Sequence, residues 1–256
     1  MKTQISIAAL ALCITAICNP VPAQTTDIDD RSAEIIDACI EAMGGEMALS
    51  DVDSLRCDVT SSMSFRGNQH SPRAVKLFIQ GSNSRWEDDA AGRVSILLSD
   101  RRYVIFRPGE NHEVLLDNKV SVSTFSPWPQ QIIGLREFPG MVQYAGELDV
   151  GGIKTHLLEF SYLRHGKTKT IRRYFDKQTH LLIRQEFSSF GWDEYAYTDF
   201  NGLILPSYIC QNLGGGTGSC VTEYTNFDLD TEFPDDIFEL PEQIRTKTGA
   251  QGDSDQ

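Results

Sequence analysis

The fold is decided by the stretch IRRYFDKQTHLLIRQEF, which spans residues 171–187. It predicts two short strands, Ile171–Asp176 and Leu181–Phe187, joined by a tight turn. Further predicted strands follow along the chain: Trp192–Phe200, Leu203–Asn212 and Cys220–Leu229. Because short turns join antiparallel neighbours, residues 148–241 predict a meander that builds a concave sheet. Such a sheet is more typical of a binding protein than of an enzyme.

The first half of the chain shows the same alternation after a helical segment. Apolar residues from Ile35 to Met43 recur at helical spacing, and Gly44-Gly45 ends the helix. Residues 54–66 then alternate between apolar and polar side chains, so one face of this strand is expected to be buried. The predicted fold class is therefore mainly β, of α+β type, with one strongly curved sheet.

The alternation breaks at residues 124–140, where Pro127, Pro129 and Pro139 surround a short helical segment. We expect a loop with a short helix, inserted between two blocks of strands. The polar residues 244–256 predict a disordered tail.

The first residues predict a secretory signal peptide. Lys2, the apolar run Ile5–Cys18 and the small residues before Gln24 predict a signal peptide over residues 1–23, cleaved after Ala23. The apolar run is too short for a membrane-spanning helix. We therefore expect an exported, periplasmic protein whose folded domain covers residues 24–243.

The charge balance restricts the partners. The chain has 36 Asp and Glu against 23 Lys and Arg, a formal net charge of −13. This excess of negative charge argues against nucleic acid and anionic lipid surfaces as partners. We expect a monomer that contacts membrane components only peripherally.

Four cysteines remain after the signal peptide: Cys39, Cys57, Cys210 and Cys220. Cys210 and Cys220 bracket a glycine-rich loop and could face each other across a hairpin. Cys39 and Cys57 could form a local pair. Export permits disulfide bonds, but four cysteines allow three pairings and the sequence does not choose among them. Metal binding lacks support, because the sequence shows no CxxC or paired-histidine spacing.

The common catalytic motifs are absent from the sequence. The glycine-rich run ends in Ser219 and leads into a strand, so it does not fit a dinucleotide-binding fingerprint. Leu116 stands where a zinc protease beginning at His112 would need its second histidine. We expect no enzymatic activity, no cofactor and no metal. A hydrolase site assembled from distant residues, such as His112 or His156 with a carboxylate, is an alternative that the sequence leaves open.

Aromatic and aliphatic residues spread over the strands and the insert predict an apolar cavity covered by a lid. In this interpretation the insert forms the lid, and its aromatic side chains face inward. The candidate cavity and lid residues are Phe65, Leu77, Trp86, Phe106, Trp128, Ile132, Phe138 and Tyr174.

Four segments together resemble exported proteins of the outer-membrane lipoprotein-sorting, LolA-like superfamily: Ile35–Leu55, Tyr174–Leu182, Tyr197–Pro206 and Phe233–Phe238. The resemblance implies an unclosed antiparallel β-barrel with helices covering its concave face, and an apolar cavity that binds acyl chains. Ser32–Met43 and Pro127–Phe138 would then be lid elements. An arginine holds the lid in the best-known carriers, and the candidates here are Arg56, Arg66 and Arg85.

Two non-enzymatic functions follow from the resemblance and the sequence. The first is a periplasmic carrier that holds a lipid, or the acyl chains of a lipoprotein, in the apolar cavity. The second is an interaction or sensor domain that uses the same scaffold to hold another envelope protein. The expected partners are accordingly a lipid or a lipidated envelope protein.

Overall fold

The computed structural model describes residues 26–81, 83–98, 103–107, 133–164, 166–187, 191–212, 214–215 and 218–240. The predicted signal peptide and the predicted tail lie outside the described residues, as do Trp128, Ile132 and His112. The described part consists mainly of strands and confirms the predicted fold class. It contains no helix of the length and apolarity that crossing a membrane requires.

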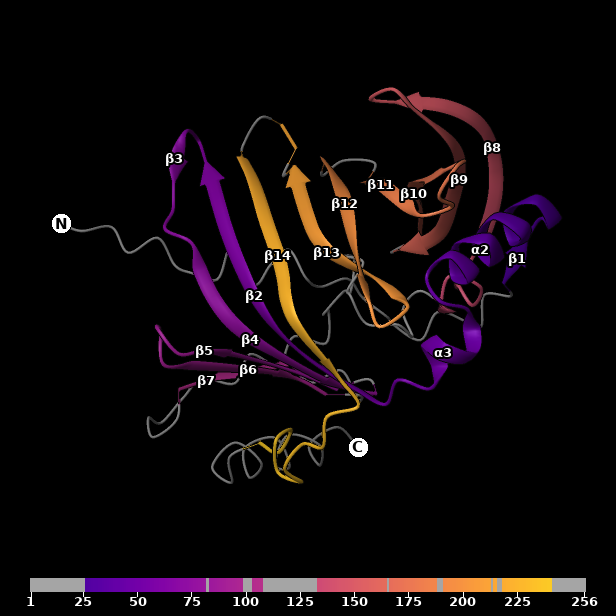
Figure 1. Cartoon of the computed structure of the whole chain (residues 1–256). Helices are drawn as coiled ribbons and strands as arrows, with labels where there is room; N and C mark the ends of the chain where they lie inside the picture. Colours follow the sequence, from indigo (N-terminus) through magenta and orange to yellow (C-terminus); the bar gives the residue numbers. More distant parts are fainter. Residues whose placement is uncertain are drawn as a thin grey trace, which may run out of the picture.

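One open sheet contains the strands of the described residues. Its order is β1-β8-β9-β10-β11-β12-β13-β14-β2-β4-β5-β6-β7, with β3 paired to β2 beside this path. Neighbouring strands are antiparallel, except that β1 runs parallel to β8. The sheet curves strongly, and its terminal strands do not pair with each other (Figure 1). This confirms the predicted unclosed, curved sheet.

The strands have these bounds: β1 Asp27–Ile28, β2 Ser54–Phe65, β3 Asn68–Gln69, β4 Arg73–Gln80, β5 Asn83–Asp88, β6 Arg93–Leu97, β7 Tyr103–Phe106, β8 Met141–Val150, β9 Ile153–Arg164, β10 Lys167–Asp176, β11 Leu182–Phe187, β12 Gly191–Phe200, β13 Leu203–Asn212 and β14 Gly218–Leu229. The turn between β10 and β11 is the one that the opening stretch predicts. The Asp176 carboxylate accepts hydrogen bonds from the backbone N–H of Gln178 and the hydroxyl of Thr179, which closes this turn.

Helix α2 (Asp30–Ala42) is fixed at its start by Asp29. The Asp29 carboxylate accepts a hydrogen bond from the backbone N–H of Ser32 at 2.8 Å and another from Tyr144 of β8 at 2.7 Å. One side chain therefore caps the helix and holds it against the sheet. Gly44 and Gly45 have positive φ angles and end this helical segment, as the sequence predicts, and α3 (Glu46–Ser50) follows.

The two helices pack against one face of the sheet, which we call the inner face. Ile36, Cys39 and Ile40 of α2 are fully buried in a cluster that also contains Phe160 and Phe175 of the sheet. Burying side chains of this size contributes about 1.5–3 kcal/mol each. The helices thereby cover the concave side of the sheet, as expected.

The opposite, outer face is partly covered by the C-terminal segment 231–240. Phe233 packs edge-on against Phe78 of β4, with ring centroids 5.7 Å apart. Arg85 Nη1 donates a hydrogen bond to the carbonyl of Ile237 at 2.7 Å. Leu240 joins a second apolar cluster on β6 and β7. Figure 1 shows this last segment passing below β5, β6 and β7.

All four cysteines of the described domain are free, so the structure contains neither candidate disulfide. Cys210 lies opposite Val221 and Cys220 lies opposite Gln211 in the β13–β14 register. The two thiols therefore point to opposite faces of the sheet, which prevents a direct bridge between them. The thiol of Cys39 lies instead 4.0 Å from the sulfur of Met43 in the core.

Candidate functional site

The inner face of β2 changes from buried to exposed along the strand. Leu55, Cys57 and Val59 are at most 1% exposed, whereas Phe65 at the far end is 37% exposed. These residues share one face because side chains alternate along a strand. The inner face is thus filled where β2 begins and offers apolar surface where β2 ends.

Two more predicted cavity residues lie on this face. Leu77 of β4 is opposite Cys57 on one side and opposite Trp86 of β5 on the other. Leu77 is fully buried, and Trp86 is half-buried against the core. The structure therefore places Phe65, Leu77 and Trp86 on the same, inner face.

Phe106 and Tyr174 lie on the outer face instead. Trp86 is opposite Ser95, and Ser95 is opposite Ile105, so these three side chains share the inner face. Phe106 follows Ile105 and therefore points to the outer face, where it packs in the cluster with Leu240. In β10, Tyr174 alternates with the inner-face residue Phe175. Its hydroxyl donates to Glu186 Oε2 at 2.9 Å, and burial raises the pKa of Tyr174 to about 12. Neither side chain can line a site on the inner face.

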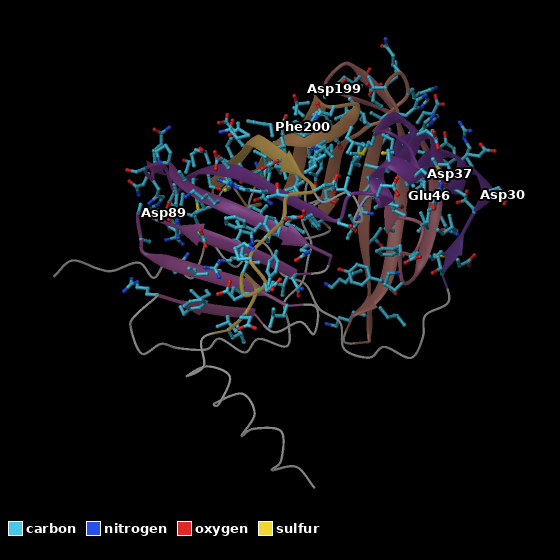
Figure 2. All side chains as sticks on the ribbon, turned by 60° about the horizontal axis from the view of Figure 1, so that its bottom comes forward. Asp30, Asp37, Glu46, Asp89, Asp199 and Phe200 are labelled. Atoms are coloured by element: carbon cyan, nitrogen blue, oxygen red, sulfur yellow. The ribbon has the colours of Figure 1, made fainter. Side chains whose placement is uncertain are left out.

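The end of the insert packs onto the inner face at the other side of the sheet. The Phe138 ring lies edge-on to the Phe160 ring, with centroids 5.1 Å apart, and Leu135 is only 4% exposed. Arg136 donates from Nε to Asp37 Oδ1 at 2.7 Å and from Nη1 to Glu46 Oε2 at 2.5 Å. Figure 2 shows Asp37 on α2 and Glu46 on α3, far from Asp89 across the sheet.

The arginine that joins the insert to both helices is therefore Arg136, which sequence reasoning missed. The three candidates lie elsewhere. Arg56 stacks near Phe78 at 5.9 Å, Arg66 lies 5.3 Å from the Phe65 ring, and Arg85 binds Glu87 and the C-terminal segment. The sequence signal for Arg136 is weak, because a single arginine in a loop has no distinguishing pattern.

A row of polar side chains crosses the inner face on four adjacent strands. Asp193 Oδ2 accepts from Gln185 Nε2 at 2.9 Å, and Asp193 Oδ1 accepts from Gln211 Nε2 at 3.3 Å. Arg173 Nε donates to Gln185 Oε1 at 3.4 Å, and its guanidinium lies 4.2 Å from the Phe160 ring centroid. Burial raises the pKa of Asp193 and lowers the pKa of Arg173 to about 10. Arg173 Nη1 is buried with no hydrogen-bond partner among the described residues.

The sequence contained a signal for this polar row. In β10 the inward positions are Ile171, Arg173 and Phe175, so a charged residue stands between two apolar ones. Only the register shows that Arg173, Gln185 and Asp193 lie side by side.

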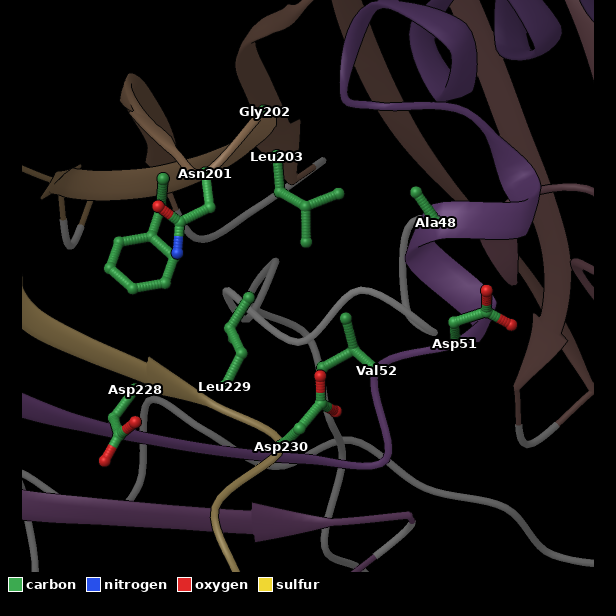
Figure 3. A pocket seen from close by; sticks show the side chains of 10 residues that line it. Ala48, Asp51, Val52, Asn201, Gly202, Leu203, Asp228, Leu229 and Asp230 are labelled. Carbon is green, nitrogen blue, oxygen red and sulfur yellow. The ribbon is translucent and has the colours of Figure 1, made fainter.

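A groove of about 410 Å³ opens where β2 begins. It lies between α3, the β12–β13 turn and the end of β14 (Figure 3). Its apolar surface comes from Ala48, Val52, Phe200, Leu203 and Leu229. Its polar surface comes from Asp51, Asn201, Asp228 and Asp230. Three segments far apart in the sequence form it, so no local motif could have predicted it.

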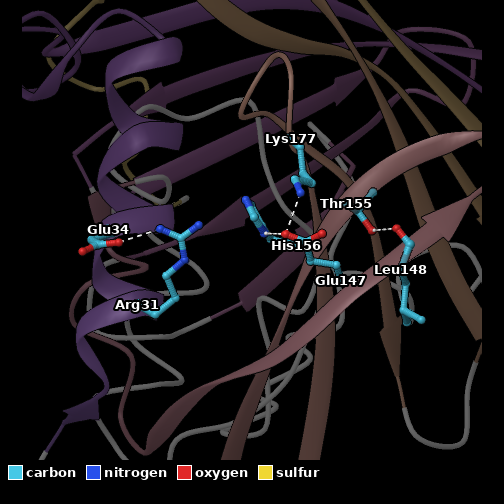
Figure 4. Close-up of polar contacts among 7 residues, drawn as sticks. All are labelled: Arg31, Glu34, Glu147, Leu148, Thr155, His156 and Lys177. Atoms are coloured by element: carbon cyan, nitrogen blue, oxygen red, sulfur yellow. Dashed lines mark hydrogen bonds and ion pairs between the residues drawn. The ribbon is translucent and has the colours of Figure 1, made fainter.

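His156 is the described histidine that sequence reasoning considered for a hydrolase. Its Nδ1 lies 3.8 Å from Glu147 Oε1, and Lys177 Nζ lies 2.6 Å from the same oxygen (Figure 4). Burial and the nearby Arg31 lower the pKa of His156. The neighbouring hydroxyl, Thr155 Oγ1, points to the other face and donates to the Leu148 carbonyl at 3.0 Å. Thr155 therefore does not form a nucleophile–histidine–carboxylate arrangement with His156 and Glu147.

The described residues contain no group of three His, Cys, Asp or Glu side chains placed to hold a metal ion. Two surfaces of the described part are candidates for binding: the apolar end of the inner face and the acidic groove.

No protein-family model matches the sequence, and no curated protein matches it. Solved structures do match. A DUF1329 family protein from Desulfovibrio piger superposes with a TM-score of 0.59 and 17% identity, over 82% of this chain and 98% of the other. A LolA superfamily protein from Nitrosomonas europaea has a TM-score of 0.57 and 16% identity, over 81% and 97%. An outer membrane lipoprotein-sorting protein domain from Vibrio parahaemolyticus has a TM-score of 0.55 and 10% identity, over 80% and 95%.

These matches extend over nearly the whole length of the three solved chains. Because the sequence identities are 17% or lower, the matches show a shared fold and nothing more. They confirm the resemblance drawn from the sequence at the level of architecture. The chain has the LolA-like fold.

Proposed function

We propose that the protein is a periplasmic carrier that holds a lipid, or the acyl chains of a lipoprotein, against the apolar end of its inner face. It binds its cargo without chemical change and needs no cofactor. Export through the predicted signal peptide, cleaved after Ala23, delivers it to the periplasm.

The exposure of Phe65 carries this proposal. A phenylalanine that is 37% exposed lies on the face of β2 that forms part of the core where the strand begins. Met63, two residues back on the same face of β2, is half-buried, and Cys220 of β14 lies opposite it. An acyl chain laid against them would remove apolar surface from water at about 25 cal/mol per Å².

The polar row supports an ordered inner face. Arg173, Gln185 and Asp193 are linked across neighbouring strands and fix the spacing of β10, β11 and β12 beneath the helices. A carrier needs a sheet whose shape persists when the cargo leaves, and buried hydrogen-bonded side chains supply such a constraint.

Native mass spectrometry of the protein, purified gently from its own envelope, tests the proposal. We expect a bound mass of lipid size and binding of a dansyl-labelled undecanoic acid. Bare protein that fails to bind this probe would contradict the carrier function.

A matched pair of variants locates the site. Phe65→Ser removes an exposed apolar side chain from the inner face and is expected to weaken probe binding at least fivefold. Leu163→Ser removes one of similar exposure, 47%, from the outer face of β9 and is expected to leave binding unchanged. Equal effects of the two substitutions would exclude the inner face as the binding site. The unfolding midpoint of each variant shows whether folding is preserved.

A further inference from the structure

The groove at the start of β2 combines an apolar floor with a rim of one charge. Figure 3 shows Val52, Leu203 and Leu229 turned toward the space between α3 and the sheet. Leu203 and Val52 are 7% and 3% exposed, so they form a fixed base that belongs to the core. These side chains cannot rotate to fill the groove, because their other sides are already packed in the core.

The charged side chains that line the groove among the described residues are carboxylates. Asp51, Asp228 and Asp230 are exposed, and no described lysine or arginine lines the groove, although Arg56 of β2 is opposite Asp228. One oxygen of Asp230 accepts a hydrogen bond from the backbone N–H of Asp53 at 3.0 Å, which fixes that carboxylate at the rim. A ligand that binds over this floor must therefore place positive charge at the rim, or its polar groups will lie against the carboxylates without a complementary charge.

We propose that this groove docks a partner protein through a segment in which apolar side chains are flanked by lysine or arginine. The apolar side chains fill the floor formed by Val52, Leu203 and Leu229, and the basic side chains lie against Asp51 and Asp230. The phosphate of a common phospholipid would meet these carboxylates, so the charges select a basic peptide over such a lipid.

The groove and the proposed lipid site lie at opposite ends of β2. Leu55, near the start of the strand, pairs with Leu229 of the groove, whereas Phe65 ends the strand. At about 3.3 Å per residue, the two positions are roughly 30 Å apart. A carrier with this arrangement can hold cargo at one end and a protein at the other, and each site can be tested without the other.

Binding of labelled hexapeptides to the full mature protein tests the proposal. The probes are KKLLKK, its acidic counterpart EELLEE and its polar counterpart KKSSKK, measured by fluorescence anisotropy at low salt. We expect KKLLKK to bind at least tenfold more tightly than either counterpart. The Phe65→Ser variant is expected to bind it like wild type, whether or not the inner face carries lipid.

Neighbouring positions on α3 provide matched variants. Ala48→Lys places a positive charge in the groove and is expected to weaken KKLLKK binding about tenfold. Met47→Lys makes the same change one residue earlier, at a side chain that is 81% exposed and does not line the groove. It is expected to change binding less than twofold. Asp51→Asn should weaken binding severalfold, and Asp89→Asn, on a distant part of the sheet, should not.

Three results would overturn the proposal. Equal binding of EELLEE would show that the rim does not select charge. Equal effects of Ala48→Lys and Met47→Lys would place the peptide outside the groove. The third result is that KKLLKK fails to bind, while dodecylammonium binds to wild type and not to Ala48→Lys. The groove would then be a site for a cationic amphiphile instead.

Discussion

The guanidinium of Arg173 lies 4.2 Å from the centre of the Phe160 ring, on the inner face of the sheet. This stacking buries the cation, but it leaves Nη1 without a hydrogen-bond partner among the described residues. The arginine is thus stabilised by packing on an aromatic ring and destabilised by incomplete solvation.

Substitution of Arg173 separates these two effects. Arg173→Met keeps most of the packing and removes the buried charge, so the free energy of unfolding should stay within about 1 kcal/mol of wild type. Arg173→Ala also leaves a void beside Phe160 and should lower it by about 2–4 kcal/mol. Urea denaturation at pH 7 measures both. A methionine variant as unstable as the alanine variant would show that the hydrogen bond to Gln185 dominates.

Asp193 should make the protein more stable in mild acid. Burial raises its pKa above the ordinary aspartate value, so the folded state binds a proton more readily than the unfolded state. The stability of the fold therefore falls as pH rises through the ordinary aspartate pKa toward the raised one. Asp193→Asn removes this group and should flatten the pH profile in that window. An unchanged profile of unfolding midpoints between pH 4 and 7 would contradict the assignment.

Asp29 should act in the opposite direction. Burial opposes its charge, but hydrogen bonds from the backbone of Ser32 and Tyr144 outweigh burial and lower its pKa. Its contribution is present above the ordinary aspartate pKa and is lost as pH falls through the folded value. Asp29→Ala should cost about 1–2 kcal/mol at pH 7 and less at pH 3. Asp30→Ala, one residue into the helix, is the control and should cost markedly less.

The thiols should react in a fixed order. Burial raises the pKa of Cys39 to about 12 and raises those of Cys57 and Cys210 as well, but Cys210 is only half-buried, whereas Cys39, Cys57 and Cys220 are buried. We expect one fast thiol in the native mature protein, lost in Cys210→Ser, and four after denaturation without reductant. Measurement with a chromogenic disulfide reagent checks both numbers. Fewer than four thiols in the denatured protein would show that it contains a disulfide.

The sequence predicted the elements better than it predicted the site. Alternation over residues 54–66 and the turn after Asp176 depend on neighbours in the chain, so β2 and the β10–β11 hairpin were predictable. The side that each residue faces was not predictable for every strand. Phe106 stands in a strand of only four residues, in which apolar side chains point to both faces of the sheet. Its orientation is decided by pairing with β6 and by Leu240, which lies far along the chain.

Tyr174 illustrates a second limit. It lies in a β10 stretch where Phe175 and Tyr174 are both buried, one on each face. The outer partner is Glu186 on β11, and a shift in the β10–β11 register beside Tyr174 determines which residues face each other. Such a bulge leaves no clear mark in a single sequence.

The pairing of β2 with β14 determines how late in synthesis the chain can fold. Leu55 pairs with Leu229, and the Ser54 hydroxyl reaches the carbonyl of Thr231, 177 residues further along. The ladder at the middle of the sheet therefore cannot form until nearly the whole chain has been synthesised. Loop closure over this separation makes folding slow. A chain that folds late stays unfolded during its synthesis, and the proposed export through a narrow channel requires an unfolded chain.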